Sequence, residues 1–297
     1  MKDLQGKTAV ITGAGSGFGL ELARLCAAEG MKLVLVDVQA DALARVADEL
    51  AAHHPMAQRV DVSSAAEMET LAAAVQARFG APHLLFNNAG VGFGGLIWEA
   101  RVADWNWVMG VNLMGVVHGV RLFTPLMLAA AQADPTWQGH IVNTASMAGM
   151  LDAPNLGVYN VSKHAVVSLS ETLYQDLALV SDQVSCSVLC PYFVPTGIHQ
   201  SHRNRDKAEL AAPTPSQRIS QAMVNKAVES GKLTAADVAK LVLDGVRERR
   251  FWLFSHPQAL GAVGERAEAI LAGRNPPDPF ADKPEVGEQL KAALRRR

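Results

Sequence analysis

Thr12-Gly13-Ala14-Gly15-Ser16-Gly17-Phe18-Gly19 is the stretch that decides the fold. It follows a short β-rich segment and precedes an apolar helical pattern over residues 18–29. Gly13 permits a tight turn, Gly17 lets backbone amides approach a phosphate, and Gly19 lets the helix pack closely on the sheet. A helix N-terminus placed in this way faces a pyrophosphate. The candidate cofactor-binding residues of this turn are Gly13, Ser16, Gly17, Phe18 and Gly19.

The next strand of the pattern, residues 32–36, ends in Asp37. A carboxylate at this place binds the two hydroxyls of an adenosine ribose and repels a 2′-phosphate. Neither Ser16 nor Val38 supplies the cation that a 2′-phosphate needs. The sequence therefore predicts NAD rather than NADP as the cofactor. The alternative is an aspartate that only ends a strand.

Strand and helix patterns alternate along the rest of the chain. Strands are expected at residues 8–12, 32–36, 57–60, 83–86, 140–146, 184–189 and 251–254, with helices between them. This alternation is typical of an α/β fold, a Rossmann-type doubly wound parallel sheet in a single domain with helices on both faces. We expect that domain over residues 1–256 and a C-terminal extension over 257–297. Residues 197–232 are an insertion, the lid segment, which is either a lid over the substrate or a flexible surface decoration.

Tyr159 and Lys163 form the candidate catalytic pair. Because they are four residues apart in a predicted helix, they lie on the same helix face. A phenol has a pKa of about 10, and a neighbouring ammonium favours the phenolate and lowers that pKa. Ser146 ends an apolar strand pattern, and Asn112 stands in a predicted helix, where asparagine is mildly unfavourable. A tyrosine and a lysine at this spacing are otherwise an ordinary helix face.

The glycine-rich turn, Asn112, Ser146, Tyr159 and Lys163 match, in order and spacing, the pattern of the short-chain dehydrogenase/reductase family, which the chain resembles from about residue 4 to residue 256. The resemblance implies an NAD(P)-dependent oxidoreductase that interconverts a secondary alcohol and a ketone. Tyr159 would be the general acid/base and Ser146 would orient the substrate oxygen. Lys163 would bind the nicotinamide ribose, and Asn112 would open its helix and complete a water relay.

Further cofactor contacts are implied by the same resemblance. Asp61 and Val62 would lie against the adenine, and Asn88, Ala89 and Gly90 would leave room for the cofactor. Pro191, Val194 and Thr196 match the element that meets the nicotinamide carboxamide. Tyr192 departs from this element, because the family has glycine there.

The substrate prediction depends on apolar side chains near these motifs. Phe93, Met147, Leu151, Tyr192 and Phe193 predict an apolar pocket for a bulky secondary alcohol or ketone, aromatic or steroid-like. The cationic side chains of the lid segment are interpreted as a solvated loop, with an anionic substrate as the alternative. They are His199, His202, Arg203 and Arg205.

Two other classes of protein compete with this interpretation. A sugar-nucleotide epimerase or dehydratase on a related fold would have glycine in place of Ser16. A non-catalytic dinucleotide-sensing or scaffold protein on the same fold would be expected to lack at least one of the four candidate catalytic residues. All four are present.

Composition restricts the partners. The 297 residues carry a net charge of −2 and a pI near 6.5, which gives no indication of a nucleic-acid or membrane partner. The three cysteines form no metal motif, so no metal site is predicted, and a reducing cytoplasm is expected. The apolar run over 108–131 is interpreted as a long helix that is mostly buried or lies at an interface, rather than as a transmembrane span. It and the helix predicted over 155–180 are expected to pair copies of the chain into a homodimer or homotetramer.

Overall fold

A parallel sheet forms the centre of the molecule. The computed structural model describes residues 1 and 3–295, apart from the side chain of residue 207. Its seven strands lie in the order β3-β2-β1-β4-β5-β6-β7, and every neighbouring pair is parallel. The strands are β1 Thr8–Thr12, β2 Lys32–Asp37, β3 Met56–Arg59, β4 Leu84–Asn87, β5 Gly139–Thr144, β6 Val184–Cys190 and β7 Trp252–Phe254. The order reverses between β1 and β4, which makes the fold doubly wound, as the sequence predicts.

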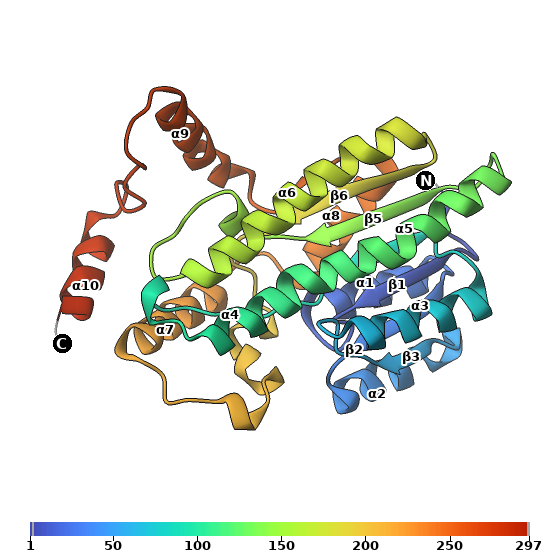
Figure 1. Ribbon diagram of the computed structural model, residues 1–297, viewed down its shortest axis with the longest axis horizontal. Helices are drawn as coiled ribbons and strands as arrows, with labels where there is room; N and C mark the ends of the chain where they lie inside the picture. Colours follow the sequence, from blue (N-terminus) through green and yellow to red (C-terminus); the bar gives the residue numbers. More distant parts are fainter. Residues whose placement is uncertain (2, 296–297) are drawn as a thin grey trace.

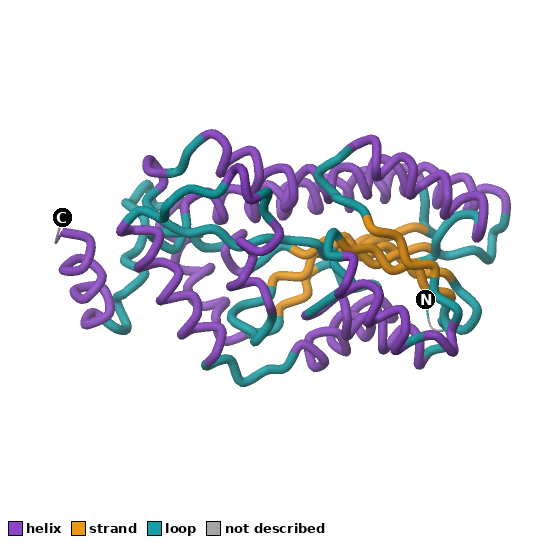
Figure 2. The backbone as a smooth tube through the Cα atoms, turned by 90° about the horizontal axis from the view of Figure 1, so that it is seen from below, coloured by secondary structure: helices purple, strands orange, loops and turns teal. Residues whose placement is uncertain are grey.

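Helices cover both faces of the sheet (Figures 1 and 2). They are α1 Gly17–Ala28, α2 Ala40–Glu49, α3 Ala65–Phe79, α4 Val102–Met109, α5 Gly115–Ala133, α6 Gly157–Val180, α7 Pro215–Glu229, α8 Ala235–Glu248, α9 Leu260–Leu271 and α10 Pro284–Arg295. The core packs α1, α2 and α8 on one face and α3, α5 and α6 on the other. The single-domain Rossmann-type architecture is therefore confirmed.

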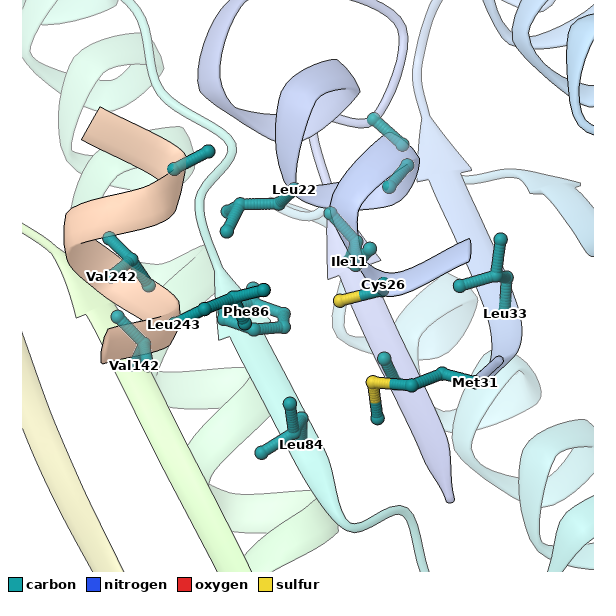
Figure 3. Close-up of a cluster of buried hydrophobic side chains, with 14 of the residues drawn as sticks. Ile11, Leu22, Cys26, Met31, Leu33, Leu84, Phe86, Val142, Val242 and Leu243 are labelled. Atoms are coloured by element: carbon teal, nitrogen blue, oxygen red, sulfur yellow. The ribbon is translucent and has the colours of Figure 1, made fainter. Parts of the chain in front are cut away.

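Alternating side chains of β1 supply both halves of the core. Ala9 and Ile11 pack toward α1 and α8, whereas Val10 packs toward α3 and α5, because successive strand residues point to opposite faces. Figure 3 shows Ile11 beside Leu22 and Phe86 in the first of these clusters. Burial of each such aliphatic side chain contributes about 1.5–3 kcal/mol. Helices thus pack on β1 from both faces of the sheet.

A chain of buried polar side chains crosses the sheet. Asn87 donates a hydrogen bond from Nδ2 to Oδ1 of Asn143 at 2.9 Å, and Asn143 donates to Oγ of Ser170 on α6 at 3.0 Å. Gly119 on α5 makes room for Asn87, because a Cβ at Gly119 would lie 2.0 Å from the Asn87 Oδ1. These contacts fix α5 and α6 relative to the ends of β4 and β5.

The helical stretch Val102–Ala133 is long and apolar enough, by length and composition, to cross a membrane. One face of it nevertheless belongs to the protein core: Phe123 and Met127 are fully buried, in the cluster that includes residues of α3 and β5. A long helix packed on the sheet explains its composition. Within it, Gly110–Met114 widens into a π-helical turn.

The lid segment and the C-terminal extension lie beyond the sheet. The lid segment consists of two 3₁₀ turns, Gly197–Asn204 and Lys207–Glu209, followed by α7. The C-terminal extension forms α9 and α10 and stands off from the sheet (Figure 1). No motif in the sequence predicts these two helices. There, α10 contacts α7. The last two residues of the extension lie outside the described residues.

Candidate active site

An elongated cavity of about 690 Å³ lies where the carboxyl ends of the strands meet. It runs from Asp37, at the end of β2, to Tyr159 and Lys163 on α6. A crevice at the point where the strand order reverses is the expected ligand site of a doubly wound sheet. The predicted residues that line it are Gly13, Ser16, Gly17, Phe18, Asp37, Asp61, Val62, Asn88, Ala89, Gly90, Tyr159, Lys163, Pro191 and Thr196.

The glycine-rich turn has the shape that a bound phosphate requires. Gly13 and Gly17 have φ values of 68° and 55°, which side chains disfavour. A Cβ at Gly19 would lie 2.1 Å from the carbonyl oxygen of Gly13, so the first turn of α1 can approach the loop only without a side chain. Because Gly17 begins α1 and lines the cavity, the helix N-terminus borders the space for a ligand.

Asp37 marks the other end of the cavity. Its Oδ2 accepts a hydrogen bond from the Gly15 amide at 2.9 Å, and its Oδ1 accepts one from the Gln39 amide at 2.9 Å. The carboxylate therefore joins the glycine-rich turn to the loop after β2 and leaves acceptor capacity for a ribose. This arrangement fits a dinucleotide whose adenosine ribose lies at β2.

The loop after β4 is tied to β1. Oγ1 of Thr12 accepts hydrogen bonds from the amides of Asn88 and Ala89 at 2.9 and 3.0 Å. Asn88 also donates from Nδ2 to the Thr12 carbonyl at 3.0 Å. These bonds hold Asn88, Ala89 and Gly90 along the wall of the cavity, as the sequence predicts for asparagines that join neighbouring loops.

Tyr159 and Lys163 meet on one face of α6. The Lys163 Nζ lies 5.8 Å from the centre of the Tyr159 ring and donates a hydrogen bond to the Thr144 carbonyl at 2.8 Å. Burial raises the pKa of Tyr159 to about 12, and a hydrogen bond with Ser146 opposes that rise. Burial also lowers the pKa of Lys163 to about 8. The expectation of a lowered tyrosine pKa is thus wrong for the protein alone, because desolvation of the buried phenol outweighs the hydrogen bond with Ser146.

Ser146 and Asn112 are the other two candidate catalytic residues. Ser146 lies at the end of β5, where its Oγ accepts a hydrogen bond from the Ala148 amide at 3.1 Å. Asn112 is fully buried in the π-helical turn, which confirms that the helix opens at this residue. Its Oδ1 accepts from the Val91 amide at 2.8 Å, and its Nδ2 donates to Oγ of Ser162 at 3.0 Å. Asn112 thereby connects the loop after β4 to α6.

The predicted substrate residues do not line this cavity. Met147 is 1% exposed in the core, and Leu151 packs against the same cluster. Phe93 packs beside Val91 and Val158. The half-exposed Tyr192 ring lies 4.6 Å from that of Phe193. Val194, whose backbone is assigned to the cofactor, is 3% exposed, and its side chain packs in the core beside α1 and α8.

Instead, α4 and the lid segment build the outer wall of the cavity. These residues are Val102, Ala103, Asn106 and Trp107 of α4, and Ile198, Ser201, Arg203, Asn204, Asp206 and Glu209 of the lid segment. None of these residues belongs to a motif that predicts a place in the cavity wall. Val102, Ala103 and Trp107, the three apolar or aromatic wall residues of α4, have the spacing of an ordinary helix face. In the described part of the chain, no three His, Cys, Asp or Glu residues gather as a metal site.

Comparison with known proteins agrees with the fold and the cavity. Residues 7–207 match the short chain dehydrogenase family model. The crystal structure of a short chain dehydrogenase/reductase from Burkholderia phymatum in complex with NAD is 52% identical, covers 95% of this chain and 100% of its own, and has a TM-score of 0.90. A CLA biosynthesis dehydrogenase/reductase of Lactiplantibacillus plantarum is 31% identical over 93% of this chain and 97% of its own. A C alpha-dehydrogenase of Sphingobium sp. is 29% identical over 99% of this chain and 94% of its own.

The sheet order, the cavity and the glycine-rich turn define a Rossmann-type fold with a dinucleotide site, and the relatives mark the protein as an NAD(P)-dependent oxidoreductase. The chain belongs to the short-chain dehydrogenase/reductase family.

Proposed function

We propose that the protein is an NAD-dependent dehydrogenase/reductase that interconverts a secondary alcohol and a ketone, with Tyr159 as general acid/base. The observation that carries this proposal is the meeting of Tyr159, Lys163 and Ser146 at one end of a cavity whose other end is formed by Asp37. The cavity thus offers a dinucleotide site and a proton-transfer site in one continuous space.

The nicotinamide dinucleotide supplies the hydride chemistry when bound, and the chain supplies positions and proton transfer. Asp37 would hold the adenosine ribose, the turn at Gly17 the pyrophosphate, and Lys163 the nicotinamide ribose. The Lys163 ammonium, with its pKa near 8, is mostly protonated at neutral pH. Its charge favours the phenolate of Tyr159 over the phenol.

Tyr159 would take the alcohol proton during oxidation and return it during reduction. Ser146, whose hydrogen bond already acts on Tyr159, would donate to the same substrate oxygen. Asn112 would pass protons toward solvent through water near Lys163. Positioned acid–base catalysis of this kind contributes about 10²–10⁴ in rate.

NAD is the proposed cofactor, and two features support it. Asp37 lines the adenosine end of the cavity with a negative charge, which repels a 2′-phosphate. The Burkholderia phymatum relative was solved in complex with NAD.

The proposed substrate is a bulky apolar alcohol or ketone. The support for this class is now the apolar part of the cavity wall rather than the aromatic residues that the sequence indicated. These side chains are Val91, Val102, Ala103, Trp107, Val111 and Ile198. Asn106, Asp206 and Glu209 add polar groups at the outer edge.

The direct test is reduced-nicotinamide formation with NAD and, separately, NADP against secondary alcohols that range from small aliphatic to aromatic and steroid. Turnover with NAD on the bulky members is expected. A preference for NADP would refute the role of Asp37. If NAD bound without any turnover, a dinucleotide-sensing function would replace this proposal.

We also propose that copies of the chain pair through α5 and α6 into a homodimer or homotetramer. In support, α6 exposes Tyr174, Leu179 and Val180, whose residues are 41%, 82% and 67% accessible. Exposed apolar side chains on one helix are a common sign of an interface. Light scattering at the monomer mass would rule the pairing out.

A further inference from the structure

Arg203 lies on the lid segment at the middle of the cavity, outside every motif of the sequence analysis. Its Nη1 donates a hydrogen bond to the Gly197 carbonyl at 2.7 Å, and its Nε faces Oε1 of Gln39 at 3.5 Å. The guanidinium therefore reaches from the loop after β6 to the loop after β2. The glycine-rich turn lies between these loops, since a Cβ at Gly17 would be 3.2 Å from Thr196.

Most of the charged side chains that line the cavity are negative, and Arg203 is one of the few positive ones. Of the described side chains that line the cavity, four are carboxylates and two are cations. The carboxylates are Asp37, Asp61, Asp206 and Glu209, and the cations are Lys163 and Arg203. Lys163 is buried at the Tyr159 end and bonded to Thr144. A dianionic pyrophosphate at the glycine-rich turn thus finds its balancing side-chain cation in Arg203.

Arg203 also has a free donor. Its Nη2 makes no hydrogen bond to any described residue, although the group lies close enough to Gly197 that a Cβ there would be 2.8 Å from Nη2. Guanidinium groups bind phosphate oxygens through two parallel N–H donors. Its position, charge and donor are those of a phosphate ligand.

The segment that carries Arg203 is fixed to the rest of the site on both sides. Oγ of Ser201 accepts a hydrogen bond from the Gly92 amide at 2.8 Å. Arg205, interpreted above as solvated, is in fact 6% exposed and donates from Nη1 to Oδ1 of Asp104 on α4 at 2.6 Å. A ligand bound by Arg203 would therefore act on the same turn that contacts the loop after β4 and α4.

We infer that Arg203 binds the pyrophosphate of the dinucleotide, so that the cofactor joins the lid segment to the glycine-rich turn. This inference rests on the proposed dinucleotide-dependent function and adds a ligand from the lid segment to it. Because the charge is solvent-exposed, salt should weaken its effect.

The test compares wild type, Arg203→Ala, Arg203→Lys and Arg218→Ala by calorimetric titration with NAD, NADP, ADP and adenosine. Arg218 is the matched control, because it lies on α7 of the same lid segment and outside the cavity. Arg203→Ala should weaken NAD and ADP about tenfold, the scale of one charge-assisted hydrogen bond, and leave adenosine unchanged. Arg203→Lys should be intermediate, and Arg218→Ala should match wild type.

A second readout is limited proteolysis of residues 197–232. NAD should protect this segment in wild type and Arg218→Ala, and not in Arg203→Ala. Three outcomes would overturn the inference. Arg203→Ala could bind NAD as tightly as wild type does, could lose as much affinity for adenosine as for NAD, or could lose affinity for NADP alone. Failure of wild type to bind NAD would instead refute the proposed function.

Discussion

The Nζ of Lys163 lies over the ring of Tyr159, 5.8 Å from its centre. The ammonium therefore faces the aromatic face rather than the phenolic oxygen, and in the protein alone the phenol keeps its proton, with a pKa near 12. Proton transfer at neutral pH thus requires the ammonium to act more strongly on the phenol once the cavity is filled. Each of the following experiments tests one part of this arrangement.

Tyr159→Phe should retain the fold and NAD binding and lose turnover by a factor of about 10²–10⁴, because it removes the hydroxyl that transfers the proton. The measurement is the rate of NADH formation at saturating NAD, together with NAD affinity. Tyr174→Phe is the control, since Tyr174 is an exposed tyrosine of the same helix. Wild-type turnover in Tyr159→Phe would remove this residue from the mechanism.

Asp37→Ala should shift cofactor preference from NAD toward NADP. The change removes both the ribose ligand and the charge that repels a 2′-phosphate, and we expect the ratio of kcat/KM for NADP over NAD to rise about tenfold or more. Asp41→Ala removes an equal charge from an exposed position at the start of α2 and should leave the ratio unchanged. An unchanged ratio in Asp37→Ala would contradict the assignment.

Asn112→Ala should lower the free energy of unfolding by roughly 2 kcal/mol or more. It leaves both the amide and the carbonyl of buried Val91 without their partner, and each unsatisfied buried group costs about 1–3 kcal/mol. Denaturant titration measures the change. Asn106→Ala, at an exposed position of α4, should stay within about 0.5 kcal/mol of wild type. Equal stability of the two variants would show that the buried bonds contribute little.

Gly19→Ala should abolish cofactor binding and destabilise the protein, because the added Cβ would lie 2.1 Å from the Gly13 carbonyl oxygen. The comparison is Gly261→Ala on α9, where a Cβ meets nothing within 4 Å. That change should stabilise α9 slightly, since alanine is favoured over glycine in a helix by about 1 kcal/mol. Thermal unfolding with and without NAD distinguishes the two, and an intact NAD-induced shift in Gly19→Ala would refute the close approach.

Stability should fall on acidification partly through His140. Burial lowers the pKa of His140 to about 3, and its ring bonds to the hydroxyls of Ser185 and Ser187. Because the unfolded chain has a histidine pKa near 6.5, it binds more protons than the folded protein between about pH 3 and 6.5. The stability contributed by neutral His140 is therefore complete above that range and lost as the pH falls through it.

The variant His140→Gln should reduce this pH dependence by about one proton, or roughly 1.4 kcal/mol per pH unit. The measurement is the slope of unfolding free energy between pH 4 and 6, which a uniform loss of stability does not change. His53→Gln, at an exposed position, should keep the wild-type slope. A wild-type slope in His140→Gln would mean that the buried ring titrates in the fold.

The sheet and the dinucleotide half of the site could be predicted because their signals are local. A glycine-rich turn after β1 and a carboxylate after β2 place a dinucleotide site at the carboxyl ends of these strands, because the two strands are neighbours in a doubly wound sheet. The catalytic set was predictable for the same reason, since Tyr159 and Lys163 share one helix face. The spacing could not predict the pKa of Tyr159, because that pKa depends on packing. Burial raises it instead of lowering it.

The cavity wall could not be predicted, because it depends on contacts between distant segments. Trp107 lines the cavity because α4 packs beside the lid segment. Met147 points into the core although it follows Ser146 directly. Likewise, no motif in residues 257–297 indicates that α9 and α10 stand beyond the sheet or that α10 contacts α7. The places of these residues depend on side-chain direction and on contacts between segments that are distant in the sequence.

The contact between α10 and α7 gives the molecule an order of assembly. Every strand of the sheet and the whole glycine-rich turn precede α10 along the chain. During synthesis, the cofactor half of the site can therefore form while the helix that supports α7 has yet to emerge. The lid segment can dock through Ser201 and Arg205 at that stage, so α10 adds the last support to α7.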